Sequence, residues 1–298
     1  MRWQDRTEHL VFRLTVAGLR RLPYSCAEQA LRTGAWVAGP VAGLRRRVVL
    51  RQLADIYPDL APDGRRALMR AVYDHLGRTA AEVFCRDPRQ LLDGVRVDPG
   101  WEVLDHAMSA GRGAIVVTGH LGNFELGGRL LATRYRLLDV IKPQRNAAFD
   151  RDLNALRNRH GIATVPVDKA GRRVLAHLRQ GGLVSLLVDQ DAGAAGLRLD
   201  FLGRPASTWP GAARLAMRVG CPVVPVAIVR SGAGHVFHLG APLTAPSGTA
   251  APDRVEHFMR RISDAVEAFV RAYPDQWFWV HRRWKGAAEA RVSGPNRI

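Results

Sequence analysis

The stretch GRGAIVVTGHLGNFELGGR, residues 111–129, constrains the fold more than any other part of the chain. Within it, residues 114–118 form a short apolar run rich in branched side chains, which is typical of a central strand covered on both faces. Glycines and an asparagine then supply turn residues, and residues 124–133 have the composition of a helix. His120 is therefore predicted at the carboxyl end of a buried strand, where open α/β sheets place their ligand sites.

The rest of the chain continues an alternation of short apolar runs and amphipathic segments. Strands are predicted at residues 137–141, 163–167, 183–188, 223–229 and 235–239, and helices at 8–57 (several), 65–84, 100–109, 149–160, 173–179, 210–219 and 254–272. This order favours a mostly parallel central sheet with helices on both faces. No linker, repeat or low-complexity tract divides the 298 residues. We expect one domain, mainly helical over residues 1–99 and α/β over the core at 100–285.

The spacing of His120 and Glu125 indicates possible acid–base chemistry. If the histidine lies in the loop and Glu125 in the first helical turn, the carboxylate can reach back to the ring. A carboxylate that holds one imidazole nitrogen leaves the other as a general base. The alternative is a loop histidine beside a solvated helix glutamate, and this stretch alone does not decide between the two.

The charge balance points to a polyanionic partner. The formal net charge is +17 and the sequence pI is about 11.2, which suits an anionic membrane, phosphate-bearing substrates or nucleic acid. A nucleic-acid-binding protein is the rival of another class, although recognised binding motifs are missing and only 7% of residues are aromatic. The three cysteines lack the spacing of a zinc site, and the nucleotide-loop, dinucleotide, zinc-protease and serine-hydrolase motifs are missing. We expect neither a metal nor a cofactor.

Several stretches resemble one known family. HLGNFE, residues 120–125, resembles the H-x4-D/E motif of glycerolipid acyltransferases, in the form used by the bacterial lipid A lauroyl/myristoyl acyltransferase family, which includes the phosphatidylinositol mannoside acyltransferases. Four later blocks resemble the same family in the same order, at residues 142–161, 186–193 (LLVDQDAG), 201–226 (beginning FLGRPAST) and 273–285 (YPDQWFWVHRRWK). Five ordered blocks are far more specific than one short motif.

The resemblance implies an enzyme that moves a fatty acyl chain from acyl-CoA or acyl carrier protein, as co-substrate, to a hydroxyl of a membrane glycolipid or lysophospholipid. His120 would be the general base, with Glu125 orienting the ring. Asp189 matches an acidic residue that pairs with the histidine in the mannoside acyltransferases, and Asp191 would shape the turn. Because both His120 and Glu125 are present, a catalytically idle scaffold of the same fold is disfavoured.

The same resemblance assigns further residues to the site. Arg157 is the candidate for stabilising the oxyanion, with Arg159 as the alternative. Substrate-binding roles fall to Asn123, Lys142, Arg159, Arg204 and Thr208. Lys142 departs from the arginine common at this point in the family, so a bidentate phosphate contact does not carry over. For Arg157 and Arg159 the alternative is phosphate binding or plain surface charge, and for Arg204 and Thr208 it is a structural turn between strand and helix.

Attachment to a membrane surface is expected without a spanning helix. Residues 8–20 place Leu10, Val11, Leu14 and Ala17 on one stripe, which either packs on the core or lies in a membrane interface. The aromatic and arginine-rich residues 277–284 also suit an interface. Without a signal peptide or spanning segment, we expect a peripheral enzyme on the cytoplasmic face of the plasma membrane. A phosphatidylinositol-mannoside-type acceptor is slightly favoured, with a lipid A-type acceptor as the runner-up.

Overall fold

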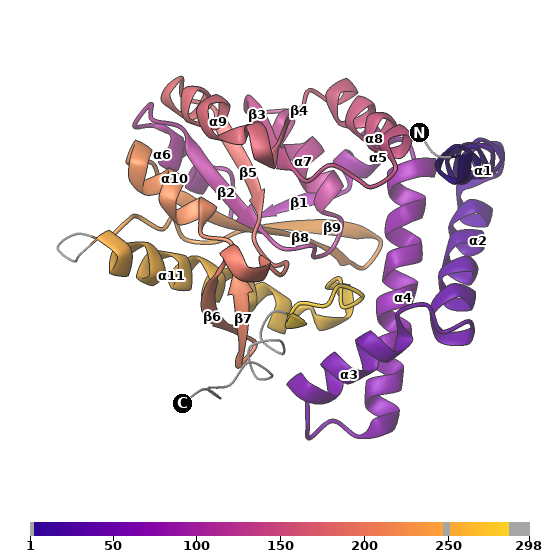
Figure 1. Cartoon of the computed structure of the whole chain (residues 1–298). Helices are drawn as coiled ribbons and strands as arrows, with labels where there is room; N and C mark the ends of the chain where they lie inside the picture. The colour runs from indigo at the N-terminus through magenta and orange to yellow at the C-terminus, as the bar shows by residue number, and fades with distance from the viewer. Residues whose placement is uncertain (1–2, 247–250, 286–298) are drawn as a thin grey trace.

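The computed structural model describes residues 3–246 and 251–285. Its centre is a seven-stranded sheet in the order β1-β9-β8-β2-β5-β3-β4 (Figure 1). The strands are β1 (Val95–Asp98), β2 (Ala114–Thr118), β3 (Leu137–Ile141), β4 (Ala163–Pro166), β5 (Leu183–Leu187), β8 (Val223–Ser231) and β9 (Gly234–Leu239). All neighbouring pairs are parallel except β8 with β9. The expected mostly parallel sheet is therefore confirmed.

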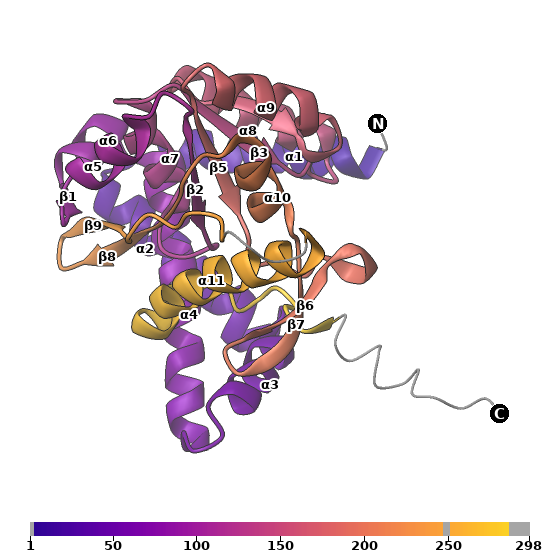
Figure 2. The same cartoon turned by 90° about the vertical axis from the view of Figure 1, so that its left-hand side faces the viewer.

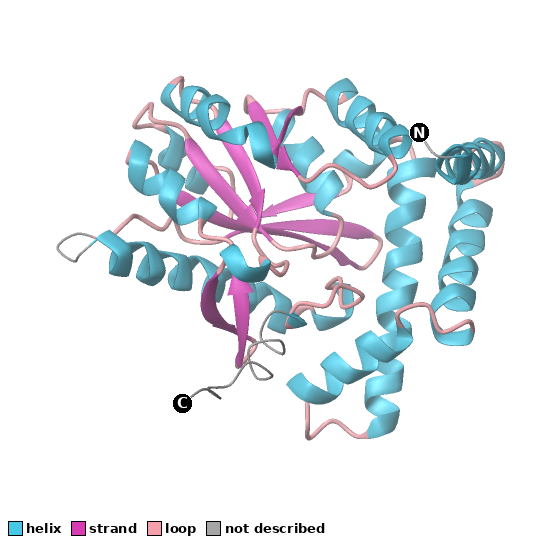
Figure 3. Ribbon diagram, in the orientation of Figure 1, coloured by secondary structure: helices cyan, strands magenta, loops and turns pink. Residues whose placement is uncertain are grey.

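Helices enclose the sheet on both faces (Figure 3). One face carries α9 (Ala170–Arg179), α10 (Gly211–Val219) and α11 (Ala251–Ala272), and the other carries α5 (Pro88–Asp93), α6 (Glu102–Met108) and α7 (Phe124–Ala132). Strand β2 shows why, since Ile115 and Val117 pack into the first layer while Ala114 and Val116 pack into the second. A strand buried on both faces is expected to be almost wholly apolar, and four of the five residues 114–118 are apolar, with the β-branched Thr118 at the end.

The chain before the sheet is helical, as expected. It comprises α1 (Trp3–Leu19), α2 (Tyr24–Trp36), the π-helical turn η1 (Val37–Val41), α3 (Arg46–Ile56) and α4 (Pro62–Cys85). Helix α4 runs alongside the α/β core, and α2 packs against the side of α4 that faces away from the sheet (Figures 1 and 2). Helix α8 (Ala147–Arg159) connects β3 to β4 and contacts α1. None of the described helices combines the length and apolarity needed to span a bilayer.

A third core cluster lies between the helical part and the sheet. It corrects the expectation that residues 277–284 suit a membrane interface. Trp277, Trp279 and Trp284 are buried in this cluster together with side chains of α3 and α4. The segment that follows η4 (Pro274–Gln276) is therefore an internal element rather than a membrane-facing one. Each of the three indole N–H groups finds an acceptor inside the protein, which makes burial of the rings favourable.

The sequence also left one hairpin unpredicted. Strands β6 (Leu197–Phe201) and β7 (Arg204–Thr208) form a separate antiparallel pair in a region where the sequence pattern predicts no strand. Leu202 and Gly203 make the turn between them, and both have positive φ, 53° and 75°. A leucine rarely adopts this conformation, so its presence gave no turn signal.

Candidate active site

Two glycines bring the turn after β2 close to its neighbours. A Cβ on Gly119 would lie 3.0 Å from Asp189 Oδ2, and one on Gly122 would lie 1.6 Å from the carbonyl oxygen of Ile228. Gly122 also has a φ of 60°, which favours glycine. The turn ends where the side chain of Asn123 accepts a hydrogen bond from Leu126 N at 3.0 Å and caps α7. The backbone that carries His120 is thereby fixed from both ends.

His120 is held by Asp189, which follows the neighbouring strand β5. The ring nitrogen Nδ1 of His120 lies 2.8 Å from Asp189 Oδ1, and the backbone N–H of His120 donates to Asp189 Oδ2 at 2.7 Å. Asp189 is only 2% exposed, whereas the His120 side chain is 23% exposed. Because the carboxylate occupies Nδ1, this nitrogen carries the hydrogen and Nε2 is left as the basic atom. The pairing that the resemblance implied for Asp189 is present.

Glu125 does not contact the His120 ring, so the expectation that its carboxylate orients the imidazole is wrong. Its Oε2 accepts a hydrogen bond from Arg157 Nε at 3.1 Å, and its Oε1 pairs with Arg157 Nη2. The third nitrogen of the guanidinium, Nη1, donates to Asn154 Oδ1 at 3.3 Å. Both charged side chains are largely buried, and a buried carboxylate beside a buried guanidinium is stabilised by pairing with it. Glu125 and Arg157 therefore tie α7 to α8.

Gln190 covers the basic nitrogen and was not among the predicted residues. Its side-chain nitrogen lies 3.2 Å from His120 Nε2. The rings of Phe124 and Phe278 flank the imidazole, with centroids 5.2 and 6.0 Å away. Any group that exchanges a proton with Nε2 must come close to it, so the Gln190 side chain has to turn aside or contact that group. In the sequence, the position of Gln190 directly after Asp189 is the feature that could have pointed to it.

Arg283 is a second residue that sequence reasoning missed, and it decides the role of Thr208. The guanidinium is fully buried and donates to the carbonyl oxygens of Gln190 and Ser207 and, at 2.6 Å, to Thr208 Oγ1. Burial lowers the pKa of Arg283 to about 10, which still leaves it charged at neutral pH. Thr208 is buried against this guanidinium and is therefore a structural residue rather than a substrate contact.

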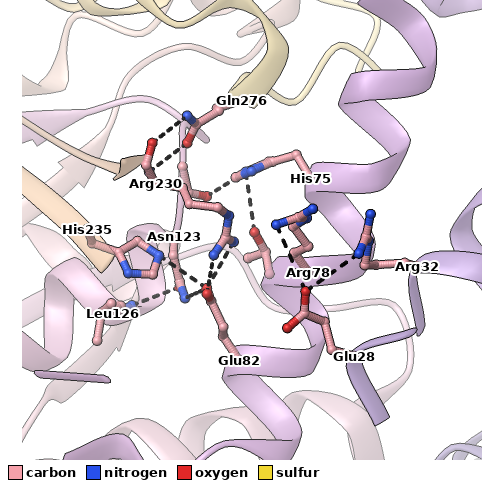
Figure 4. A network of polar contacts seen from close by, with 12 residues as sticks. Glu28, Arg32, His75, Arg78, Glu82, Asn123, Leu126, Arg230, His235 and Gln276 are labelled. Atoms are coloured by element: carbon pink, nitrogen blue, oxygen red, sulfur yellow. Dashed lines mark hydrogen bonds and ion pairs between the residues drawn. The ribbon is translucent and has the colours of Figure 1, made fainter. Parts of the chain in front are cut away.

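A buried polar network holds the turn between β2 and α7, which carries His120 (Figure 4). Glu82 of α4 is 1% exposed and pairs with Arg230 at the end of β8, and its Oε2 lies 3.3 Å from His235 Nε2. Asn123 donates its amide N–H to Glu82 Oε2 at 2.9 Å and is itself buried. The substrate-binding role expected of Asn123 is therefore wrong, because both ends of its side chain are engaged inside the protein. On the same helix, His75 Nε2 lies 3.2 Å from the carbonyl oxygen of Gly122.

Three further candidates are Arg204, Lys142 and Arg159, and none of the described hydrogen bonds or ion pairs joins them to His120. Arg204 pairs with Asp55, and its guanidinium carbon lies 5.7 Å from the ring centroid of Trp284, so this arginine secures the β6–β7 hairpin to the helical part instead of facing a substrate. Lys142 and Arg159 are exposed. Within the described residues, no three His, Cys, Asp or Glu side chains converge as a metal site would require.

A cavity of about 390 Å³ lies between α1 and α8. Eight of its twelve lining residues are apolar, and the other four, Arg13, Arg20, Asp152 and Arg159, are charged. The lining residues are Phe12, Arg13, Val16, Ala17, Arg20, Phe84, Phe149, Asp152, Leu153, Ala155, Leu156 and Arg159. The sequence predicts an apolar groove or tunnel that ends at His120, with walls from the helix after His120 and from the amino-terminal helices, and this cavity has only the second of these walls. His120 is not among its lining residues, and α8 takes the place that we expected for α7.

The fold places a histidine that is held by a carboxylate at the end of the central strand of a mostly parallel sheet. This arrangement is typical of enzymes that activate a hydroxyl group. The sequence profile described as bacterial lipid A biosynthesis acyltransferase matches residues 8–286. The chain therefore belongs to this family, which confirms the resemblance, and it is an acyltransferase of lipid biosynthesis.

Individual relatives show the breadth of the likeness. The phosphatidylinositol mannoside acyltransferase of Mycobacterium tuberculosis H37Rv is 27% identical over 281 residues, covering 89% of this chain and 85% of that protein. The lipid A biosynthesis palmitoleoyltransferase of Escherichia coli K12 is 24% identical over 255 residues, covering 84% and 81%. Among solved structures, the 1-acyl-sn-glycerophosphate acyltransferase of Thermotoga maritima aligns with a TM-score of 0.37 and 14% identity, covering 75% of this chain and 96% of that one.

Proposed function

We propose that the chain transfers a fatty acyl group from a thioester, acyl-CoA or acyl carrier protein, to a hydroxyl of a membrane glycolipid or lysophospholipid, with His120 as the general base. The observation that carries this proposal is the 2.8 Å contact between His120 Nδ1 and Asp189 Oδ1, which leaves Nε2 basic. The family membership supplies the reaction type. Acyl transfer between a thioester and an alcohol requires only proton transfer and oxyanion stabilisation, so this chemistry needs no further cofactor.

In the proposed reaction, the acceptor hydroxyl gives its proton to His120 Nε2 while its oxygen attacks the thioester carbonyl. The new C–O bond forms a tetrahedral intermediate, and the C–S bond then breaks. The imidazolium returns the proton to the departing thiolate, so that the histidine ends neutral. Asp189 stabilises the transient positive charge on the ring.

The oxyanion needs donors other than Arg157. Its guanidinium is held by Glu125 and Asn154, and none of its described contacts reaches His120, so we propose that Arg157 positions α7 and α8. The backbone N–H groups at the start of α7 and the side-chain amide of Gln190 are the proposed donors, because they lie next to His120.

The cavity between α1 and α8 is the proposed site of the donor's acyl chain. Its apolar walls suit a hydrocarbon, and its volume lies in the range of ligand pockets. The arginines among its walls suit the phosphates of a donor such as acyl-CoA. Arg159, exposed on α8, thus keeps a substrate-binding role in this proposal, while Lys142 offers only a point charge to an anionic substrate.

We propose peripheral attachment to the cytoplasmic face of the plasma membrane through the amino-terminal helices. Leu10, Val11 and Leu14 of α1 are all more than half exposed, and Trp36 at the end of α2 and Val41 in η1 are also exposed. Phe12 faces the opposite way and packs edge-on against Phe84, with ring centroids 5.2 Å apart. The stripe that sequence left undecided is thus uncovered in the structure, as an interfacial helix requires.

The mannoside-type acceptor stays slightly favoured over a lipid A-type acceptor, because the mannoside acyltransferase is similar to this chain at higher identity and coverage. The test incubates the purified protein with acyl-CoA or acyl carrier protein donors and a panel of lyso-lipids and glycolipids, and reads the products by mass spectrometry. His120→Ala should lower transfer by roughly two to four orders of magnitude. Wild-type turnover in that variant would disprove the proposed role of the histidine.

A further inference from the structure

Both oxygens of the Asp189 carboxylate are occupied. Oδ1 binds Nδ1 of His120, and Oδ2 accepts from the backbone N–H of His120 and from Nε1 of Trp277, each at 2.7 Å. Two of these three contacts come from His120 itself. Trp277 supplies the third from a segment far along the chain, so it fixes the plane of the carboxylate relative to the rest of the fold.

The indole of Trp277 cannot change its direction easily. It is 2% exposed, and its ring packs edge-on against Trp279, with centroids 4.7 Å apart, and lies 5.6 Å from the ring of Phe201. Its backbone forms a bridge with Leu121, and the next residue, Phe278, donates its N–H to the carbonyl oxygen of His120 at 3.0 Å. One short segment therefore holds both the histidine backbone and its carboxylate partner.

We infer that Trp277 is a positioning residue that keeps Asp189 aligned with His120 and favours the neutral, basic form of the imidazole. This inference rests on the proposed function, in which that form starts the reaction. A hydrogen bond to a carboxylate is strongest when no positive charge lies beside the carboxylate. The indole N–H therefore stabilises the pair more before His120 takes up a proton than afterwards.

The charges around the pair agree with this role. Burial alone would raise the pKa of Asp189, but the charge of His120 and the hydrogen bonds from His120 and Trp277 lower it overall. The other charged or titratable groups that act on this region are His281, Asp191 and Arg283. His281 accepts a hydrogen bond from Asp191 N at 3.1 Å, and Arg283 binds the carbonyl oxygen of Gln190. None of these three donates to the Asp189 oxygens in the described part of the chain.

The test uses three matched variants of the whole chain, Trp277→Phe, Trp279→Phe and Trp284→Phe. Each removes a buried indole N–H from the same cluster, but the acceptors of Trp279 and Trp284 are the carbonyl oxygens of Pro274 and Phe201. NMR of histidine-labelled protein follows the His120 ring, assigned with His120→Gln. The titration midpoint should rise by about half to one pH unit in Trp277→Phe only, and kcat should fall about ten-fold with KM unchanged.

An unchanged midpoint in Trp277→Phe, or an equal change in Trp279→Phe, would overturn the inference. If Trp277→Phe does not fold, the wild-type protein decides: the indole N–H signal of Trp277 should shift with the same midpoint as the His120 ring, while those of Trp279 and Trp284 should not. A Trp277 signal that ignores the histidine would equally overturn it. Neither NMR measurement needs a substrate, so a missing transferase activity would refute the proposed function without deciding the role of Trp277.

Discussion

At the scale of residues, the two carboxylates near His120 have different duties. Asp189 contacts the ring and Glu125 contacts Arg157. Asp189→Asn should therefore lower kcat by about three to four orders of magnitude, because an amide can donate to Nδ1 and move the hydrogen to Nε2. Glu125→Gln should cost only about ten-fold, through a loosened contact between α7 and α8. Purified variants assayed at saturating substrate check this order.

Comparing Asp189→Asn with Glu125→Gln also provides an internal control. Both substitutions replace a carboxylate by its amide, so they differ only in which partner is lost. If Glu125→Gln were as inactive as Asp189→Asn, the geometry described for the site would be wrong. Far-ultraviolet circular dichroism and the midpoint of thermal unfolding serve as controls that both variants are folded.

Sequence could place His120 and Asp189 at strand ends but could not choose between Asp189 and Glu125. The choice depends on the pairing of β2 with β5, in which Thr118 is the partner of Leu187. This register puts the histidine and the aspartate each two residues beyond paired positions. Three helices and two strands separate β2 from β5 along the chain, so their adjacency is a property of the sheet order, which local patterns do not contain.

At the scale of elements, α4 supports the turn that carries the histidine through a buried ion pair. Glu82→Gln would leave Arg230 without its charged partner in a nearly closed site. We expect a loss of about 3 kcal/mol in the free energy of unfolding, since breaking a buried pair leaves an uncompensated charge. Denaturant unfolding measures this, with Glu256→Gln as the control, because Glu256 pairs with Arg260 on the exposed side of α11 and should lose less than about 0.5 kcal/mol. Equal losses would contradict the assigned role.

His75 on the same helix predicts a pH dependence of stability. Burial, aided by the positive charge of Arg230, lowers the pKa of His75 to about 4 from its ordinary value of 6.5. Between pH 6.5 and 4 the unfolded chain therefore binds more protons than the folded one, so stability falls as the pH is lowered through this window. His75→Gln should show a shallower decline in denaturant unfolding, while His257→Gln, at an exposed position, should keep the wild-type slope. A slope unchanged by His75→Gln would refute this assignment.

Strong periodicity made most elements predictable, and its absence explains the exceptions. Strand β2 was predicted with the bounds that the structure has, because four of its five residues are apolar and the fifth, Thr118, is β-branched. Strand β1 is only four residues long and partly buried, so its alternation of valine with a charged residue is too short to stand out as a strand. The tryptophans of residues 277–284 were read as interfacial because composition alone does not say which surface covers a ring.

At the scale of the whole molecule, the uncovered stripe of α1 predicts reversible binding to anionic vesicles. Replacing Leu10 and Leu14 by serine should weaken partitioning about ten-fold or more, because these side chains would otherwise leave water at the interface. Val167→Ser is the control, since that valine is also exposed but lies just after β4. Raising the salt concentration should release part of the wild-type protein. Co-sedimentation that ignores salt, lipid charge and the leucines would contradict this docking face.

The catalytic pair and its tryptophan come from distant parts of the chain. His120 and Asp189 are 69 residues apart, and Trp277 is 88 residues beyond Asp189. Contacts of such long range form late in folding, because loop closure must precede them. After dilution from denaturant, the helix signal, which depends on local contacts, should therefore recover before transfer activity does. Activity in a refolding mixture would then count only those molecules in which the last long loops have closed.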